Sequence, residues 1–96
     1  MIRHVVFFSA RDRADYDRIH DGLSLLAQIP HHRHFELGRN LQGDMISDAP
    51  VDIVVYAEFE DEAALAAYKA HPLYEESIRR VRPLRDQRIA ADFTAG

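Results

Sequence analysis

Hydrophobic and polar positions along the chain predict four strands. Residues 2–9, IRHVVFFS, are β-branched and aromatic without a helical period, and residues 51–59, VDIVVYAEF, form the strongest strand pattern. Residues 33–39 and 87–93 are shorter candidates of the same kind. Residues 40–50 are rich in turn-forming residues and predict a surface loop between two of these strands.

Two helical regions separate the strands. Apolar residues recur at steps of three and four from Asp12 or Asp15 onward, and Pro30 ends this first helix. Asp61 is suited to cap a second helix, since a side-chain carboxylate accepts from the backbone N–H groups of a first turn. Proline is tolerated only in the first turn of a helix, so the second region is predicted to break and restart at Pro72.

This order of elements, βαββαβ, is that of the ferredoxin-like fold. The predicted fold class is therefore α+β, a four-stranded antiparallel sheet with both helical regions on one face. Each strand has a second apolar face, however, which carries Val5 and Phe7 in one strand and Val54 and Tyr56 in another. An exposed patch of this kind needs a cover, and a second copy of the chain is the simplest one. We expect a homodimer through this face.

Composition limits the remaining possibilities. Residues 1–96 suffice for one domain, and a net charge of −4 with scattered basic residues argues against a nucleic-acid partner. There is no cysteine for a disulfide or a thiolate, and the longest apolar run near the N-terminus, VVFF, is too short for a membrane span. A cytoplasmic protein without membrane contact is the expectation.

Four polar residues are candidates for chemistry. His4 is in phase with the apolar residues of its strand, so it is either a satisfied core histidine or an acid–base residue. Tyr68 is either a packing residue or a hydroxyl donor. His71 precedes a proline at the predicted break, which favours a structural role that includes bonds to free carbonyls of the first helical piece. Tyr74 is a possible donor but a poor base, because the phenol pKa is near 10.

Metal and cofactor signals are weak. The run HHRH at 31–34 places His32 and His34 on one face with Glu36, but a metal site needs three or four convergent ligands, and a solvated loop is the simpler interpretation. No phosphate loop, flavin or nicotinamide fingerprint occurs. We predict neither a metal nor a cofactor.

Several segments in order carry a resemblance that spans nearly the whole chain: IRHVVFF, LLAQIP, FELGRN, VDIVVYAEFEDEAALAAYKAHPLY and IAADF. Together they resemble the stress-responsive A/B barrel (Dabb) family. The resemblance implies a dimeric α+β barrel with a pocket between the sheet and helices of each subunit, where His4 and Tyr68 would lie. Cyclase members of the family carry HPxH with the second histidine as base, whereas this chain has HPLY, with Tyr74 at that position.

The leading hypothesis is a homodimeric barrel that binds a small, largely apolar molecule. One alternative is a cofactor-independent cyclase, isomerase or monooxygenase-like enzyme with His4 as base and Tyr68 and Tyr74 as donors. Another is a structural stress-response oligomer without catalysis. The glycine at position 22 is unusual inside a helix, and we expect it either to face the pocket or to pack closely. The predicted ligand-binding residues are His4, Ile19, Gly22, Val55, Ala57, Tyr68, His71 and Tyr74.

Overall fold

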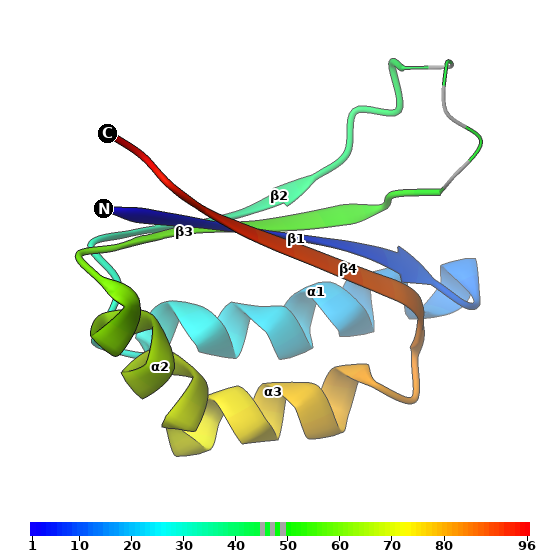
Figure 1. Cartoon of the computed structure of the whole chain (residues 1–96). Helices are drawn as coiled ribbons and strands as arrows, with labels where there is room; N and C mark the ends of the chain where they lie inside the picture. The colour runs from blue at the N-terminus through cyan, green and yellow to red at the C-terminus, as the bar shows by residue number, and fades with distance from the viewer. Residues whose placement is uncertain (45, 47, 49) are drawn as a thin grey trace.

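The structure, a computed structural model, describes all residues except 45, 47 and 49. Its elements follow the predicted order: β1 (Ile2–Ala10), a 3-10 turn η1 (Arg13–Asp15), α1 (Tyr16–Ser24), a 3-10 turn η2 (Leu25–Gln28), β2 (His34–Arg39), β3 (Ile53–Phe59), α2 (Glu62–Ala70), α3 (Pro72–Val81) and β4 (Arg85–Thr94). The strands form one antiparallel sheet in the order β2-β3-β1-β4, with all helices on one face (Figure 1). The predicted ferredoxin-like α+β fold is confirmed.

Strand boundaries differ from the prediction by one or two residues. β3 starts at Ile53 rather than at residue 51. Just before it, the Asp52 backbone N–H donates to the Phe8 carbonyl at 2.8 Å, and the Asp52 carboxylate accepts from the Ala10 N–H at 2.8 Å. The predicted 40–50 loop has no helix or strand in its described residues, and positions 45, 47 and 49 of that prediction lie outside the described chain.

The predicted break in the second helical region is confirmed. Asp61 caps α2 by accepting from the Ala64 N–H at 2.8 Å, α2 ends at Ala70, and α3 begins at Pro72. The expected role of His71 needs correction. Its Nδ1 accepts from the Leu73 N–H at 3.1 Å, so this side chain caps the start of α3 instead of bonding the carbonyls at the end of α2.

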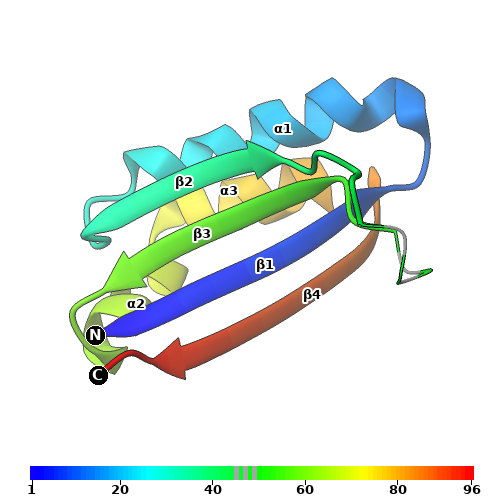
Figure 2. The ribbon, with the colours of Figure 1, turned by 90° about the horizontal axis from the view of Figure 1, so that it is seen from above.

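The two faces of the sheet have different surroundings. The face toward the helices carries the buried core residues Val6, Phe8, Val55, Ala57 and Phe59. The opposite face, which we call the open face, has no layer over it in this chain (Figure 2). Pairing of neighbouring strands places these apolar side chains together on it: Val5, Phe7, Val54, Tyr56, Ile89 and Phe93.

The edge strand β4 is nearly uncovered even on its helix side. Figure 2 shows α1 and α3 behind β2 and β3, whereas β4 lies beyond them. Arg88, Ala90 and Asp92 pair with the buried residues Phe8, Val6 and His4 of β1, yet all three are exposed. The helices therefore leave the helix side of β4 uncovered.

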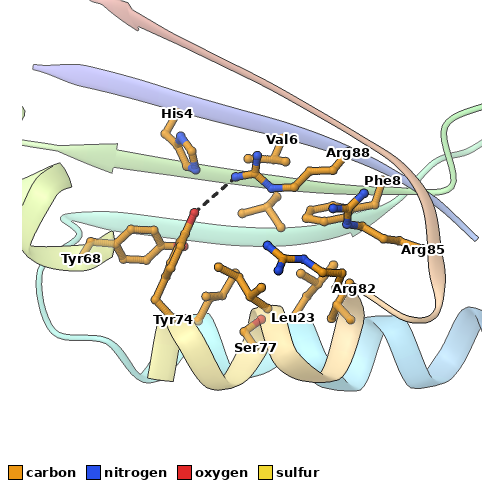
Figure 3. Close-up of a pocket in the computed structure, with 14 residues that line it drawn as sticks. His4, Val6, Phe8, Leu23, Tyr68, Tyr74, Ser77, Arg82, Arg85 and Arg88 are labelled. Carbon is orange, nitrogen blue, oxygen red and sulfur yellow. Dashed lines mark hydrogen bonds between the residues drawn. The ribbon is translucent and has the colours of Figure 1, made fainter. Parts of the chain in front are cut away.

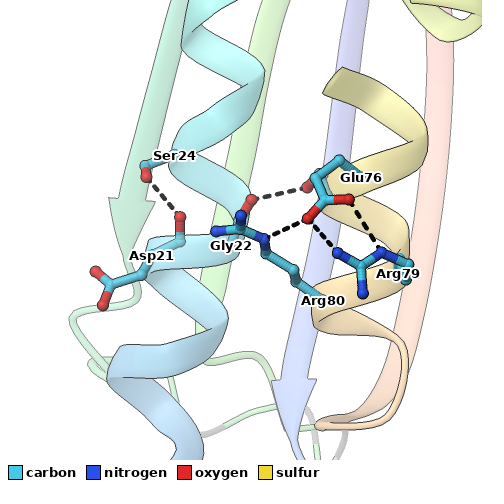
Figure 4. A network of polar contacts seen from close by, with 7 residues as sticks. Asp21, Gly22, Ser24, Glu76, Arg79 and Arg80 are labelled. Carbon is cyan, nitrogen blue, oxygen red and sulfur yellow. Dashed lines mark hydrogen bonds and ion pairs between the residues drawn. The ribbon is translucent and has the colours of Figure 1, made fainter. Parts of the chain in front are cut away.

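Gly22 belongs to the contact between α1 and α3. A Cβ at this position would lie 2.8 Å from Cγ2 of the buried Val81, and the Gly22 carbonyl accepts from the Ser77 hydroxyl at 2.9 Å (Figure 4). Of the two alternatives considered from the sequence, close packing is the one observed. The glycine lets the two helices approach each other, and so it helps to set the position of α3 under the sheet.

We expect Gly22→Ala to lower the free energy of unfolding by about 1–2 kcal/mol, because overpacking against the stiff Val81 side chain outweighs the gain of about 1 kcal/mol in helix propensity. Urea denaturation measures this. Gly38→Ala is the matched control, since a Cβ there meets no atom within 4 Å. In a protein that already carries Val81→Ala, adding Gly22→Ala should lower the free energy of unfolding much less than it does in the wild-type protein. A stabilised Gly22→Ala protein would contradict the packing argument.

Candidate functional site

A pocket of about 230 Å³ lies between the helix face of the sheet and α3 (Figure 3). Its walls come from every layer of the fold: β1 and β3 above, η2 and the end of α1 behind, and α2 and α3 below. The apolar part of the lining consists of Val6, Phe8, Leu23, Leu26, Val55, Ile78 and Val81. This part of the lining favours an apolar ligand body.

Three of the polar residues predicted from the sequence line this pocket together. His4 enters from β1, Tyr68 from α2 and Tyr74 from the first turn of α3. In Figure 3 the His4 ring is directed from the sheet toward the hydroxyl end of Tyr74, with Tyr68 behind them. Val55, a fourth predicted residue, forms part of the wall on β3.

His4 is buried, with 1% of its surface exposed, and is held by Asp92. The two residues face each other across the β1–β4 pairing, and Nδ1 of His4 is hydrogen-bonded to Oδ1 of Asp92. Burial lowers the pKa of His4, and the hydrogen bond and charge of Asp92 oppose this shift without cancelling it. At neutral pH the imidazole is therefore uncharged. Since Nδ1–H donates to the carboxylate, Nε2 carries a lone pair and is a potential base.

Tyr68 is completely buried and its hydroxyl has no hydrogen-bond partner within the described part of the chain. Its ring packs against Phe59, Tyr74 and His4, with centroid distances of 4.9, 5.3 and 6.1 Å. Burial raises the pKa of the Tyr68 phenol well above its usual range, and Tyr74 raises it further. The phenol stays protonated, so this hydroxyl is an unused donor in the pocket wall.

Tyr74 is half-buried and contacts the basic side of the pocket. Its hydroxyl accepts a hydrogen bond from Nη2 of Arg88 on β4 at 3.3 Å (Figure 3). With its oxygen accepting from a cation, the phenol O–H is polarised toward donation. The tyrosine at the position of the cyclase-type histidine thus accepts from Arg88 and keeps its own O–H free to donate.

The structure corrects the assignment of four other residues to the pocket lining. Ile19 is fully buried in the core on α1, and Gly22 lies in the α1–α3 contact. Ala57 is buried beside His4 on the neighbouring strand, and His71 caps α3. All four lie outside the described lining of the pocket. Helical and strand periodicity places residues on the right face, but it does not say how far along that face the cavity extends.

Sequence reasoning missed the charged side of the site. Arg82, Arg85 and Arg88 line the pocket, whereas the sequence pattern presents the basic residues only as scattered charges. Asp92 was noted as part of a family-like segment but not as the partner of His4. Both roles depend on the antiparallel register of β1 and β4, which joins residues 88 positions apart.

The histidine run 31–34 forms no metal site among the described residues. His34 Nε2 bonds Glu36 Oε1 at 2.8 Å, and no group of three or more potential metal ligands occurs among the described residues. His32 packs against Phe35 instead, with ring centroids 5.2 Å apart. Within the described residues, no helix has the length and apolar character needed to cross a membrane.

Comparison with known proteins agrees with this architecture. A Dabb family protein with a ferredoxin-like fold from Mesorhizobium loti is 25% identical, with a TM-score of 0.80, over 98% of this chain and 95% of that one. A dimeric ferredoxin-like protein of unknown function from Jannaschia is 20% identical, with a TM-score of 0.84, over 98% of both chains. A putative antibiotic biosynthesis monooxygenase from Nitrosomonas europaea is 15% identical, with a TM-score of 0.78, over 99% and 98%.

No curated relative matches the chain. The family model described as the Stress responsive A/B Barrel Domain matches residues 2–95, which is nearly the entire sequence. This chain therefore belongs to the stress-responsive A/B barrel (Dabb) family.

Proposed function

We propose that this protein binds a small, largely apolar molecule in the pocket between sheet and helices. The observation that carries the proposal is the unpartnered, fully buried hydroxyl of Tyr68 in an apolar pocket wall. A buried polar group without a partner destabilises the free protein by about 1–3 kcal/mol, so its retention beside a cavity indicates that a ligand supplies the missing bond.

The size of the pocket limits the ligand. A cavity of roughly 150 Å³ accommodates benzene. The pocket here, at about 230 Å³, has space for a single ring with a short chain or a few substituents.

We expect Tyr68→Phe to weaken the binding of phenol, used as a neutral single-ring probe, by about 0.5–3 kcal/mol, because one hydrogen-bonding partner is lost. The same change should raise the free energy of unfolding of the unliganded protein by about 1 kcal/mol, since it removes an unsatisfied buried hydroxyl. Calorimetric titration and urea denaturation measure the two effects.

Tyr16→Phe is the matched control, because the Tyr16 hydroxyl donates to the Asp52 carbonyl at 3.0 Å, away from the pocket. It should leave phenol affinity unchanged. Wild-type protein that stays an intact dimer but binds no phenol at millimolar concentration would favour a structural stress-response oligomer instead.

A second candidate, cofactor-independent proton transfer, is favoured by the His4–Asp92 pair. His4 Nε2 would take a proton from a carbon next to a carbonyl group; the C–H electrons then move to the carbonyl oxygen and form an enolate. Asp92 stabilises the resulting imidazolium, and the hydroxyls of Tyr68 and Tyr74 would donate to the enolate oxygen. Isomerisation and aldol-type cyclisation both begin with this step. The likeness to a putative monooxygenase from Nitrosomonas europaea is consistent with it.

Exchange of the α-protons of phenylacetone in D₂O, followed by NMR, tests this step. We expect His4→Ala to lower the protein-dependent rate by about 100-fold or more, and Tyr16→Phe to leave it unchanged. The rate should fall as the pH drops through the pKa of His4, which lies below 6.5, because only neutral imidazole is a base. The other charged groups acting on His4 are Asp92, Lys69 and Arg88.

Asp92→Asn removes the negative charge that raises the His4 pKa and replaces the charge-assisted hydrogen bond with a weaker neutral one. The acid limb of the rate profile should therefore move to lower pH in this variant. Exchange that persists in His4→Ala, or a pH profile unaffected by Asp92→Asn, would contradict the assignment of His4 as the base.

We also propose that two copies associate through the open face. Phe7, Ile89 and Phe93 are 38%, 52% and 52% exposed on it in the single chain. A contiguous apolar face on a sheet is typical of an interface, and the solved ferredoxin-like proteins from Jannaschia and Bacteroides fragilis are described as dimeric. Two such sheets face to face would form the barrel that the family is named for.

Phe7→Glu or Val54→Lys should give monomers or insoluble protein, because each would bury a charge between the two sheets. Analytical ultracentrifugation distinguishes these outcomes. Ala66→Glu, on an exposed position of α2, is the control and should leave the dimer intact. A wild-type protein that sediments as a stable monomer at micromolar concentration would overturn the proposal.

A further inference from the structure

We propose that the molecule bound in this pocket is an organic acid, whose carboxylate is held by an arginine rim formed by Arg82, Arg85 and Arg88. The inference rests on the proposed binding function and specifies its ligand class: a single-ring apolar body with one carboxylate on a short chain. The positions and the pairing of these three arginines carry it.

The three guanidinium groups lie on one side of the pocket. Arg82 follows the end of α3, and Arg85 and Arg88 come from β4, so the rim spans the gap between helix and sheet. Figure 3 shows all three side chains directed into this gap, with the apolar residues and His4 beside them. The pocket thus has an apolar interior and a cationic entrance, which suits an amphipathic anion.

No carboxylate neutralises this rim. None of the three guanidinium groups has an acidic partner within 4 Å in the described chain. Arg79 and Arg80, which lie on α3 just before the rim, both pair with Glu76 on the outer surface (Figure 4). The chain has more acidic than basic residues overall, so the lack of acidic partners among the described residues is specific to the pocket rim.

The acidic partner of His4 is already engaged. Asp92 bonds His4 through Oδ1, and its Oδ2 lies 3.9 Å from the Lys69 ammonium. Among the rim residues, Arg88 donates one hydrogen bond to the Tyr74 hydroxyl, and the described chain provides no other side-chain partner for the three guanidinium groups. Their remaining N–H groups are available to an incoming anion.

Repulsion among the rim arginines also favours the binding of an anion. Burial lowers the pKa of Arg85, and the positive charges of Arg82, Arg88 and Arg11 lower it further. A carboxylate between these side chains would relieve that repulsion and accept paired N–H donors from a planar guanidinium group, which is the geometry in which arginine binds carboxylates best.

Calorimetric titration with 3-phenylpropanoate and its neutral amide, 3-phenylpropanamide, tests the inference. We expect the wild-type protein to bind the acid about tenfold more tightly than the amide at low salt, and this preference should shrink as NaCl is added. Arg85→Gln and Arg88→Gln should each reduce the ratio of acid to amide affinity several-fold. Arg79→Gln, outside the pocket, is the matched control and should keep the preference.

The outcomes separate the two proposals. Equal binding of acid and amide would overturn the organic-acid inference and leave small-molecule binding standing. A preference that survives both Arg85→Gln and Arg88→Gln would also overturn it, because the anion would then be held elsewhere. Binding of neither probe nor phenol would overturn the binding function itself, and this inference with it. Unchanged circular dichroism of the variants shows that they remain folded.

Discussion

Three helices of nine or ten residues on one side cannot cover both faces of a four-stranded sheet, and most features of this protein follow from that constraint. On one side the open face is left with exposed phenylalanines, which a second copy can bury. On the other side the helices stop short of β4, so the edge strand overhangs them. The pocket lies between β1, β4 and α3, where the helices leave β4 uncovered.

The site contains polar groups whose burial destabilises the unliganded folded protein, together with groups that hold them in position. A neutral imidazole in the core is tolerated because Asp92, on the exposed edge strand β4, accepts a hydrogen bond from it. Tyr68 has no such partner in the described chain. A group of this kind is a stability disadvantage in the absence of ligand, as expected where function and stability conflict.

Helix α3 has three roles. It packs on α1 through Gly22 and Val81, and beside this contact it carries the exposed ion pairs of Glu76 with Arg79 and Arg80 (Figure 4). Its C-terminal end leads into the arginine rim. These exposed i,i+3 and i,i+4 pairs add little stability by themselves. Because Glu76 pairs with Arg79 and Arg80, it is not a partner for the rim arginines, which have no acidic partner around the described pocket.

The sequence by itself determined the elements, their order and the apolar open face, because strand alternation, helical spacing, Asp61 and Pro72 are local signals that act over a few residues. It also placed His4 and Tyr68 on the helix side of the fold. Only the tertiary structure decided which residues meet there. The β1–β4 register joins His4 to Asp92, and the α1–α3 contact assigns Gly22 to packing rather than to the pocket. The arginine rim forms because a helix end and an edge strand come together. Contacts between residues so distant in the chain depend on register and helix placement, which no local pattern encodes.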